Sequence, residues 1–228
     1  MRLSVIIPVY NEKETIREII HRVKSIEPAD KEIIIVDDRS TDGSREILDG
    51  VREEGIRVVL HSKNMGKGAA IRTGFANAKG DILVIQDADL EYDPKEIPML
   101  IRPIEEGVAD AVFGTRLTGG KPQRVHMFWH RVGNNVMTLF ANILFNTTLT
   151  DVTTCYKAFK RDFIKDIKIK SDGFSIESEL TAKILKKEAR LYEMPISYYG
   201  RSYKEGKKIK FYHAVGIIWA LIKFRFVD

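Results

Sequence analysis

The 228-residue chain has a single cysteine, little net charge and few prolines. One cysteine, Cys155, excludes an intrachain disulfide and a cysteine-rich metal site. The 37 lysines and arginines are nearly balanced by 32 aspartates and glutamates, so the formal net charge is only +5 and we expect no nucleic-acid partner. With 44% hydrophobic residues, the chain can bury the core of one large domain or of two closely packed halves.

The sequence also lacks the patterns of a membrane-spanning helix and of a secretory signal. The uncharged run Ala214–Ile222 covers nine positions, whereas a spanning helix needs about 20. Met1–Pro8 reads as an apolar strand rather than as a signal peptide with a cleavage site. We therefore expect a cytoplasmic protein.

Strand and helix patterns alternate through the first half of the chain. Short apolar runs typical of strands occur at Leu3–Val9, Glu32–Asp38, Arg57–His61, Ile82–Ile85 and Ala111–Gly114. Helical segments with short connections separate them, which predicts an α/β fold with a mainly parallel sheet flanked by helices.

The pattern changes near residue 120, after which three helical segments are predicted. They cover Val125–Phe145, Phe174–Lys187 and Ile209–Phe226. We therefore divide the chain into a nucleotide-binding half, residues 1–120, and an acceptor-side half, residues 121–228.

Carboxylates follow the predicted strand Ile82–Ile85, at the end of a parallel strand that faces the ligand crevice. Asp87, Asp89 and Glu91 occupy alternate positions, so their side chains point the same way in an extended chain. Their oxygens are hard ligands of the kind that Mg²⁺ or Mn²⁺ prefers. A solvated acidic turn before Asp93 is the alternative at this point.

Polar segments follow two further strands, at Pro8–Glu12 and at Asp37-Asp38, and all three strand ends converge on one crevice in such a sheet. Several carboxylates beside a diphosphate need a divalent cation between them, so a metal-bound nucleotide diphosphate is the predicted ligand.

The turn Gly66-Lys67-Gly68 precedes a helix, as phosphate-binding turns do. However, Ile71 stands where a dinucleotide fingerprint needs glycine, and the Walker pattern is missing. A tight turn before a helix that packs close to the sheet is an equally good interpretation.

In their order and spacing, these motifs resemble those of family 2 glycosyltransferases with the GT-A fold. The resemblance is carried by Val5–Glu12, Ile35–Gly43, Asn64–Gly68 and Gln86–Asp89. Later segments are similar to the polyprenyl-phosphate branch of the family, the dolichol-phosphate mannose or glucose synthases: Gly114–Arg116, Thr150–Lys157 and Met194–Ile196. The resemblance implies a GT-A type, Rossmann-like sheet with a helical acceptor-side extension.

The resemblance also implies roles for individual residues. The nucleotide sugar would be bound by Pro8, Tyr10, Glu12, Asp37, Lys67, Asp87 and Asp89. The metal would be bound by Asp89 and Glu91, and phosphate oxygens of the acceptor or donor would meet Arg116, Arg131 and Arg201. The chain departs from the family pattern at Arg39, where glycine is usual, and at Glu91, where glutamine is common.

The implied reaction is inverting transfer of a hexose, mannose or glucose, from GDP-mannose or UDP-glucose to a polyprenyl phosphate. A cation held by Asp89 would stabilise the departing diphosphate. A phosphate acceptor is already anionic, so it needs positive charge, which the three arginines supply, rather than a general base.

Two other functions remain open at the level of sequence. A saccharide hydroxyl as acceptor needs a carboxylate base, for which Asp151 is the first candidate, followed by Glu177 and Glu179. A turn or a helix cap is the alternative role for Asp151, and a solvated helix face is the alternative for both glutamates, favoured for Glu179. A catalytically silent sugar-nucleotide-binding subunit is the third hypothesis, although such a protein has no need of the intact metal ligands.

Cations and aromatic residues surround the C-terminal uncharged run. The cations are Lys204, Lys207, Lys208, Lys210, Lys223 and Arg225. A basic, aromatic-rich helix can lie in the headgroup region of an anionic membrane, which predicts a peripheral contact with the cytoplasmic face of a membrane. Packing against the domain or against a partner chain is an equal alternative.

Overall fold

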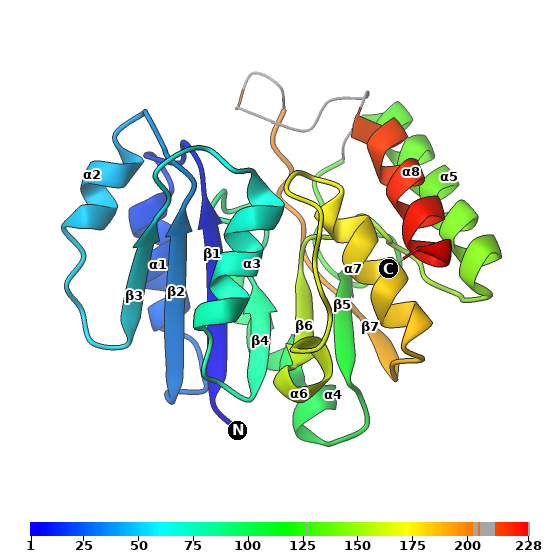
Figure 1. Cartoon of the computed structure of the whole chain (residues 1–228), viewed down its shortest axis with the longest axis horizontal. Helices are drawn as coiled ribbons and strands as arrows, with labels where there is room; N and C mark the ends of the chain where they lie inside the picture. Colours follow the sequence, from blue (N-terminus) through cyan, green and yellow to red (C-terminus); the bar gives the residue numbers. More distant parts are fainter. Residues whose placement is uncertain (126, 203–204, 206–212, 228) are drawn as a thin grey trace.

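A computed structural model of the chain describes residues 1–125, 127–202, 205 and 213–227. Its centre is a seven-stranded sheet with the order β3-β2-β1-β4-β6-β5-β7 (Figure 1). The strands are β1 (Leu3–Val9), β2 (Lys31–Asp37), β3 (Ile56–Leu60), β4 (Ile82–Ile85), β5 (Ala111–Thr115), β6 (Lys157–Lys160) and β7 (Leu191–Pro195). All pairs are parallel except those of β6. The predicted mainly parallel α/β sheet is thus confirmed.

The sequence patterns identified the first five strands but not β6 and β7. Strand β6 has four residues with lysine at both ends, and it pairs antiparallel with β4 and with β5. Strand β7 carries a glutamate and ends in proline. Such short strands with charged residues lack the apolar run on which the prediction relied.

Successive side chains of the strands enter two separate cores, because strand residues alternate between the faces of a sheet. On one face, α1 (Ile16–Lys24), α2 (Ser44–Asp49), the 3-10 turn η1 (Pro94–Glu96) and α4 (Ile97–Glu105) lie over side chains such as Val5 and Ile7. On the other face, α3 (Lys67–Asn77), α6 (Arg161–Ile164) and α7 (Ile176–Lys186) lie over Ile6 and Ile34.

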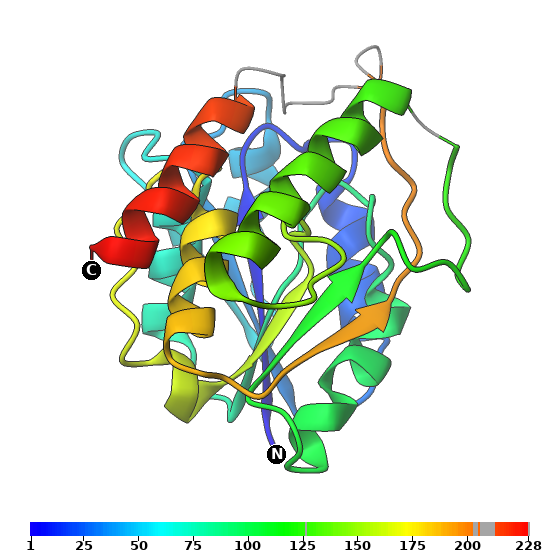
Figure 2. The ribbon, with the colours of Figure 1, turned by 90° about the vertical axis from the view of Figure 1, so that its right-hand side faces the viewer.

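Two further helices, α5 (Phe128–Phe145) and α8 (His213–Phe226), form an outer layer beside α7. Figures 1 and 2 show them next to each other, with α8 at the C-terminal end of the chain. Helix α5 begins three residues later than predicted. The start of the predicted segment Ile209–Phe226 lies outside the described residues, as do Lys204, Lys207, Lys208 and Lys210.

The outer faces of these two helices expose large apolar side chains. Trp129 and Ile143 on α5 are 76% and 73% exposed, and Val215 and Trp219 on α8 are 71% and 63% exposed. Within the part of the chain that the structure describes, no helix combines the length and the apolar character needed to cross a bilayer.

Candidate active site

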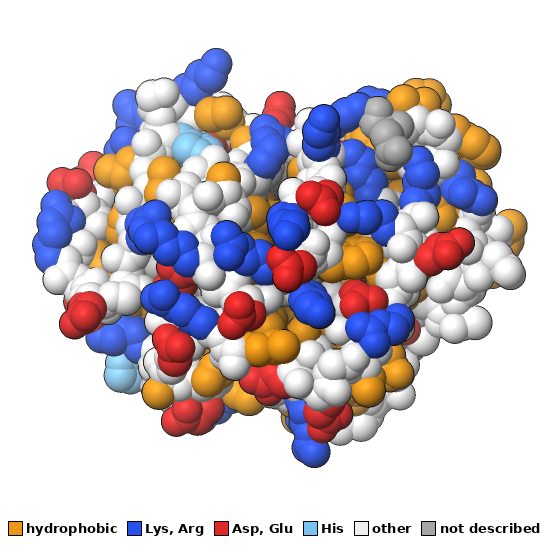
Figure 3. Space-filling model, turned by 60° about the horizontal axis from the view of Figure 1, so that its bottom comes forward, with side chains coloured by type: hydrophobic (Ala, Val, Ile, Leu, Met, Phe, Trp, Pro, Cys, Tyr) orange, Lys and Arg blue, Asp and Glu red, His pale blue; other side chains and the backbone are white. Residues whose placement is uncertain are grey.

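A cavity of about 880 Å³ opens at the carboxyl ends of the parallel strands. It lies where the strand order reverses, because β2 and β4 flank β1 on opposite sides; such a switch point is the usual ligand crevice of an open α/β sheet. On the face seen when the bottom of the molecule is turned forward, basic and acidic side chains are interspersed (Figure 3). The cavity wall includes most of the predicted site residues: Pro8, Tyr10, Glu12, Lys67, Asp87, Asp89, Glu91, Arg116, Arg131 and Arg201.

Two of the predicted residues are not in the wall of this cavity. Asp37 is fully buried below it, where its carboxylate pairs with Arg45 at 3.0 Å and accepts a hydrogen bond from the Ser40 amide. Its neighbour Asp38 lines the cavity instead. Asp151 is also fully buried and is not among the lining residues.

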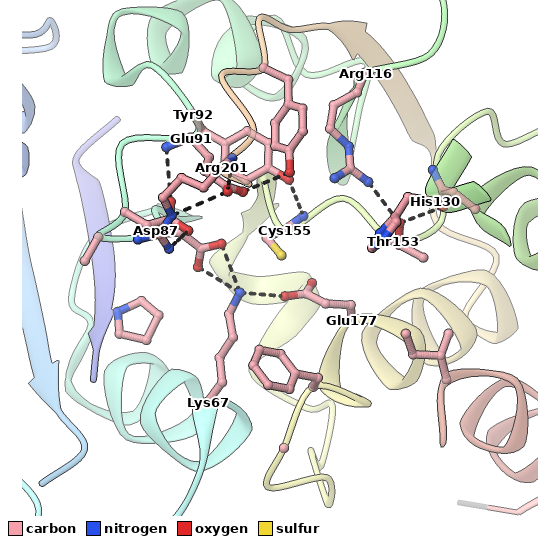
Figure 4. A pocket seen from close by; sticks show the side chains of 18 of the residues that line it. Lys67, Asp87, Glu91, Tyr92, Arg116, His130, Thr153, Cys155, Glu177 and Arg201 are labelled. Atoms are coloured by element: carbon pink, nitrogen blue, oxygen red, sulfur yellow. Dashed lines mark hydrogen bonds and ion pairs between the residues drawn. The ribbon is translucent and has the colours of Figure 1, made fainter. Parts of the chain in front are cut away.

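Asp87 is held by Lys67, the first residue of α3. The Lys67 ammonium lies 2.8 Å from one Asp87 oxygen, 3.0 Å from the other and 3.3 Å from Glu177 Oε1 (Figure 4). Burial opposes the charged form of this lysine, but the two carboxylates outweigh it and raise the pKa of Lys67 well above its usual value. Lys67 therefore stays charged in the wall of the cavity, paired with these two carboxylates.

The ion pairs of Glu177 continue into the core. Its other oxygen lies 3.1 Å from the ammonium of Lys157, which is completely buried and also lies over the Phe113 ring. Two lysines and two carboxylates, from α3, β6, α7 and the segment after β4, thus form one charge-balanced cluster. Cys155, 7% exposed, lies beside this cluster as the predicted small buried residue.

A solvated helix face, the alternative for both glutamates of α7 and the favoured one for Glu179, is wrong. Glu177 is 5% exposed and Glu179 is fully buried. Glu179 pairs with Lys183 at 2.8 Å and accepts hydrogen bonds from the amides of Lys170 and Ser171. The sequence around Glu177 and Glu179 gave no sign that each glutamate pairs with a buried lysine.

Arg201, which follows β7, reaches across the cavity to the carboxylates at the end of β4. Its Nη2 lies 2.9 Å from Asp89 Oδ2, and its Nη1 lies 3.2 Å from Glu12 Oε2. Its backbone amide donates to Glu91 Oε1 at 2.7 Å, and Tyr198 donates its hydroxyl hydrogen to the other oxygen of Glu91 at 2.9 Å. In this structure Arg201 is therefore bound to carboxylates.

Asp89 lies among like charges. Burial raises its pKa to about 7, the negative charges of Asp87 and Glu91 add to the rise, and Arg201 opposes it. A carboxylate in this position favours a nearby cation, because like charges at close range disfavour the ionised form.

The acidic residues fit a divalent cation by their chemistry, since Asp89 and Glu91 offer hard oxygen donors at a strand end. They are not assembled around a metal position: across the described ranges, no three acidic, histidine or cysteine side chains are arranged to hold an ion. The carboxylates point toward cations of the chain instead: Asp87 pairs with Lys67, and Asp89 pairs with Arg201.

Arg116, which follows β5, is fixed by a bidentate ion pair. Its Nε lies 2.6 Å from Asp151 Oδ2 and its Nη2 lies 2.7 Å from Asp151 Oδ1, while Thr153 accepts a further hydrogen bond at 2.9 Å. The guanidinium also lies 5.0 Å from the centroid of the Tyr198 ring. Burial alone would raise the pKa of Asp151, but Arg116 outweighs burial and holds that pKa below its usual value.

A support for this pair that the sequence analysis missed comes from α5. Asn134 donates to Asp151 Oδ1 at 3.0 Å and accepts a hydrogen bond from Thr153 at 2.6 Å. Arg131, one turn earlier on α5, is exposed and lines the cavity. All three predicted arginines thus line the cavity, Arg116 and Arg201 in ion pairs with carboxylates and Arg131 on α5.

The turn Gly66-Lys67-Gly68 packs against protein. The Gly68 amide donates to the Asp172 carbonyl at 2.6 Å, and a Cβ on Gly68 would lie 2.1 Å from the Ser171 carbonyl oxygen. The amides of Met65 and Gly66 donate to Asp38 at 2.8 and 2.6 Å. The close-packing interpretation of this turn therefore holds, and Gly66 and Lys67 of the turn line the cavity.

Arg39 occupies a backbone position that favours glycine. Its φ is +64°, in the left-handed region. The glycine expected there from the resemblance is thus explained by backbone geometry, and the arginine side chain is exposed.

Comparison with known proteins identifies the family. The family model described as Glycosyl transferase family 2 matches residues 4–168. The chain is 28% identical over 211 residues to a dolichol-phosphate mannosyltransferase of Pyrococcus furiosus, covering 91% of this chain and 59% of that protein. It is 29% identical over 221 residues to an undecaprenyl-phosphate mannosyltransferase of Micrococcus luteus, covering 91% of this chain and 87% of that protein.

Among solved structures, glucosyl-3-phosphoglycerate synthase of Mycobacterium tuberculosis in complex with Mn²⁺, uridine diphosphate and phosphoglyceric acid has the same fold. The TM-score is 0.76 at 20% identity, and the match covers all of this chain and 79% of that one. The chain spans 59% of the Pyrococcus protein and most of the other two.

Proposed function

Because this chain belongs to glycosyl transferase family 2, we propose that it transfers a hexose, with inversion, from a nucleotide-diphosphate sugar to a polyprenyl phosphate. The observation that carries this proposal is the continuity of one cavity. Its wall contains three groups of side chains, named here by their residues: the carboxylates and Lys67 (the inner end), Arg116 and Arg131 (the middle), and apolar side chains of α5 and α8 (the mouth). Two of the relatives act on polyprenyl phosphates by name, which supports the same acceptor class.

The inner end is proposed to bind the donor, GDP-mannose or UDP-glucose. Residues of the 1–120 half supply it: Pro8, Tyr10, Glu12, Lys67 and Asp87 line the cavity there, with Asp37 buried below. Asp89 and Glu91 would hold Mg²⁺ or Mn²⁺, which supplies Lewis-acid stabilisation of the leaving diphosphate. The ammonium of Lys67 lies at the same end, charged and paired with Asp87.

The middle of the cavity is proposed to bind the acceptor phosphate. Arg116 enters it with its Nε and Nη2 already bonded to Asp151 and Thr153, so the guanidinium plane is fixed before any ligand arrives. A fixed guanidinium is well suited to phosphate oxygens, and a phosphate nucleophile needs no general base. We propose that Asp151 acts by positioning Arg116, because both of its oxygens are already engaged.

The mouth is proposed to receive the polyprenyl chain. Met127 and Phe128 at the start of α5, Met137 on α5 and Ile217 on α8 line it. The mouth lies next to the exposed apolar faces of the two helices, where Trp129 and Trp219 are each more than 60% exposed. A bilayer surface covering these faces would deliver an isoprenoid to the cavity, so we place the working enzyme peripherally on the cytoplasmic face of a membrane.

The proposal is tested by transfer of labelled sugar from GDP-mannose and from UDP-glucose to a polyprenyl phosphate, with Mg²⁺, with Mn²⁺ and with a chelator, counted after organic extraction. Label in the lipid phase that needs the metal is the expected result. Asp89→Asn, which keeps the size of the side chain, should lose most of the transfer while the protein still folds.

Two outcomes contradict specific parts of the proposal. Donor consumption without lipid-linked product moves the acceptor to a hydroxyl, and Asp151, Glu177 and Glu179 then become candidates for the base. Transfer that survives both chelation and Asp89→Asn removes the metal role.

A further inference from the structure

Arg201 lies where three carboxylates from distant parts of the chain converge. Besides Asp89 Oδ2 at 2.9 Å, its guanidinium meets Glu12 Oε2 at 3.2 Å and Glu12 Oε1 at 3.4 Å, and its Nε lies 3.5 Å from Glu91 Oε1. Figure 4 shows the side chain extended over the acidic segment that follows β4. One monovalent cation of the chain thus pairs with three carboxylates that face the donor end of the cavity and neutralises part of their charge.

This arrangement conflicts with a bound divalent ion. Arg201 holds Asp89 Oδ2 at 2.9 Å, and Asp89 Oδ1 accepts a hydrogen bond from the Glu91 amide at 3.1 Å, so both oxygens of this carboxylate already have partners. A guanidinium beside a divalent cation is also repelled by it. Asp89 therefore cannot serve both cations in this geometry, and the side chain of Arg201 has to leave before a metal binds.

The placement of Arg201 also leaves part of its bonding capacity unused. Its Nε is buried and forms no hydrogen bond with any residue that the structure describes. The backbone of the same residue is tied to Glu91 by the 2.7 Å hydrogen bond of its amide, independently of the side chain. The side chain can therefore move while its attachment point stays at the edge of the site.

We propose that Arg201 is an internal substitute for the metal: it occupies the carboxylate site in the donor-free protein and is displaced when a divalent cation binds with the donor. This inference rests on the proposed function for the identity of the donor, but the competition is a property of this chain alone. Its consequence is that the charge of the acidic site stays partly neutralised between turnovers and that the metal alone binds weakly.

The competition is measured with Mn²⁺ alone and no nucleotide, by titrating the full chain and following the free ion by electron paramagnetic resonance. Arg201→Met removes the competing charge. If the site is open in about a tenth of the wild-type molecules, the variant binds Mn²⁺ about tenfold more tightly. Adding Asp89→Asn to the variant should abolish the gain, which assigns the gain to this site.

The matched control is Arg190→Met. Arg190 pairs with Asp110 at 2.7 Å near the opposite ends of the strands, so its loss changes the net charge equally without touching the cavity. Its Mn²⁺ affinity should equal that of the wild type.

Equal Mn²⁺ binding by the wild type and Arg201→Met, including no binding by either, overturns the proposal, as does a similar gain in Arg190→Met. These results are separable from those of the transfer assay. If sugar is transferred to polyprenyl phosphate but Arg201→Met binds Mn²⁺ no more tightly than the wild type, the proposed function stands and the role of Arg201 as a substitute for the metal is rejected. If Arg201→Met binds Mn²⁺ more tightly but no sugar reaches polyprenyl phosphate, the role of Arg201 stands and the proposed acceptor is rejected.

Discussion

Arg116 and Asp151 form a bidentate ion pair, with N–O distances of 2.6 and 2.7 Å, in which the carboxylate is completely buried and the guanidinium borders the cavity. The pair joins the end of β5 to the segment before β6, and Asn134 of α5 completes its hydrogen bonds. The sequence predicted both residues as site residues but gave no sign of their direct contact.

Replacing Asp151 with asparagine should lower sugar transfer about 100-fold, because a misplaced reactant or catalytic group costs about that much. The loss should appear mainly as a higher KM for the acceptor, since Arg116 loses its orientation. Steady-state kinetics against polyprenyl phosphate measure it. Asp110→Asn is the control, because Asp110 holds Arg190 in a similar fork away from the cavity. Equal activity of the two variants would contradict the positioning role.

The same pair should give the protein a recognisable pH dependence of stability. The folded-state pKa of Asp151 lies below the usual value of 3.8, so the pair contributes stability that is fully present above that value and is lost as the pH falls through the folded pKa. We expect the difference in the free energy of unfolding between wild type and Asp151→Asn to be constant from about pH 5 to pH 7. In that range the pH lies above the ordinary aspartate pKa of about 3.8, so Asp151 is ionised in the folded and in the unfolded protein. Urea unfolding should show it shrinking below about pH 4, and a difference that grows with acidification would refute this account.

The buried Lys157–Glu177 pair should be costly to break from one side. Glu177→Leu leaves the completely buried ammonium of Lys157 without a carboxylate, and we expect a loss of about 3–5 kcal/mol in the free energy of unfolding. The double variant Lys157→Met with Glu177→Leu should recover most of that loss, because no charge then remains unpaired. A double-mutant cycle by chemical denaturation measures the coupling, and simple additivity of the two single changes would argue against the pair.

Gly68→Ala should destabilise the protein by about 1–3 kcal/mol, because its Cβ would meet the Ser171 carbonyl oxygen at 2.1 Å and force the backbone apart. Gly133→Ala is the control: it also lies in a helix, but nothing comes within 4 Å of its Cβ. That control should be neutral or more stable by about 1 kcal/mol, as alanine favours helices. Thermal unfolding compares them, and similar melting temperatures would show that the loop carrying Ser171 yields easily.

The exposed apolar faces of α5 and α8 should bind anionic vesicles in a salt-sensitive manner. Trp129→Ser combined with Trp219→Ser should weaken binding at least tenfold, because a buried large apolar side chain contributes about 1.5–3 kcal/mol. Tyr192→Ser on β7, at a 46% exposed position, is the control and should bind like the wild type. Co-sedimentation with vesicles measures this, and a wild-type protein that stays in the supernatant would remove the membrane contact.

Much of the fold and part of the site could be predicted because their signals are local. The apolar runs that form β1 to β5 are visible within a few residues, and the carboxylates after β4 stand directly at a strand end. The family match over residues 4–168 confirms the resemblance drawn from the motifs. By contrast, β6 was missed because four residues with terminal lysines carry no strand pattern.

By itself, the sequence determined the order of the first five strands and placed Asp87, Asp89 and Glu91 at the carboxyl end of a strand, since apolar periodicity and strand-end position are properties of neighbouring residues. Only the tertiary structure decided which cation each carboxylate meets. Lys67 is 20 positions from Asp87, and Arg201 is 112 positions from Asp89. Such pairs form because the sheet topology brings the ends of β1, β4 and β7 to one cavity and excludes water there. The distance between two side chains and their burial depend on residues far apart in the chain, so the local sequence does not predict them.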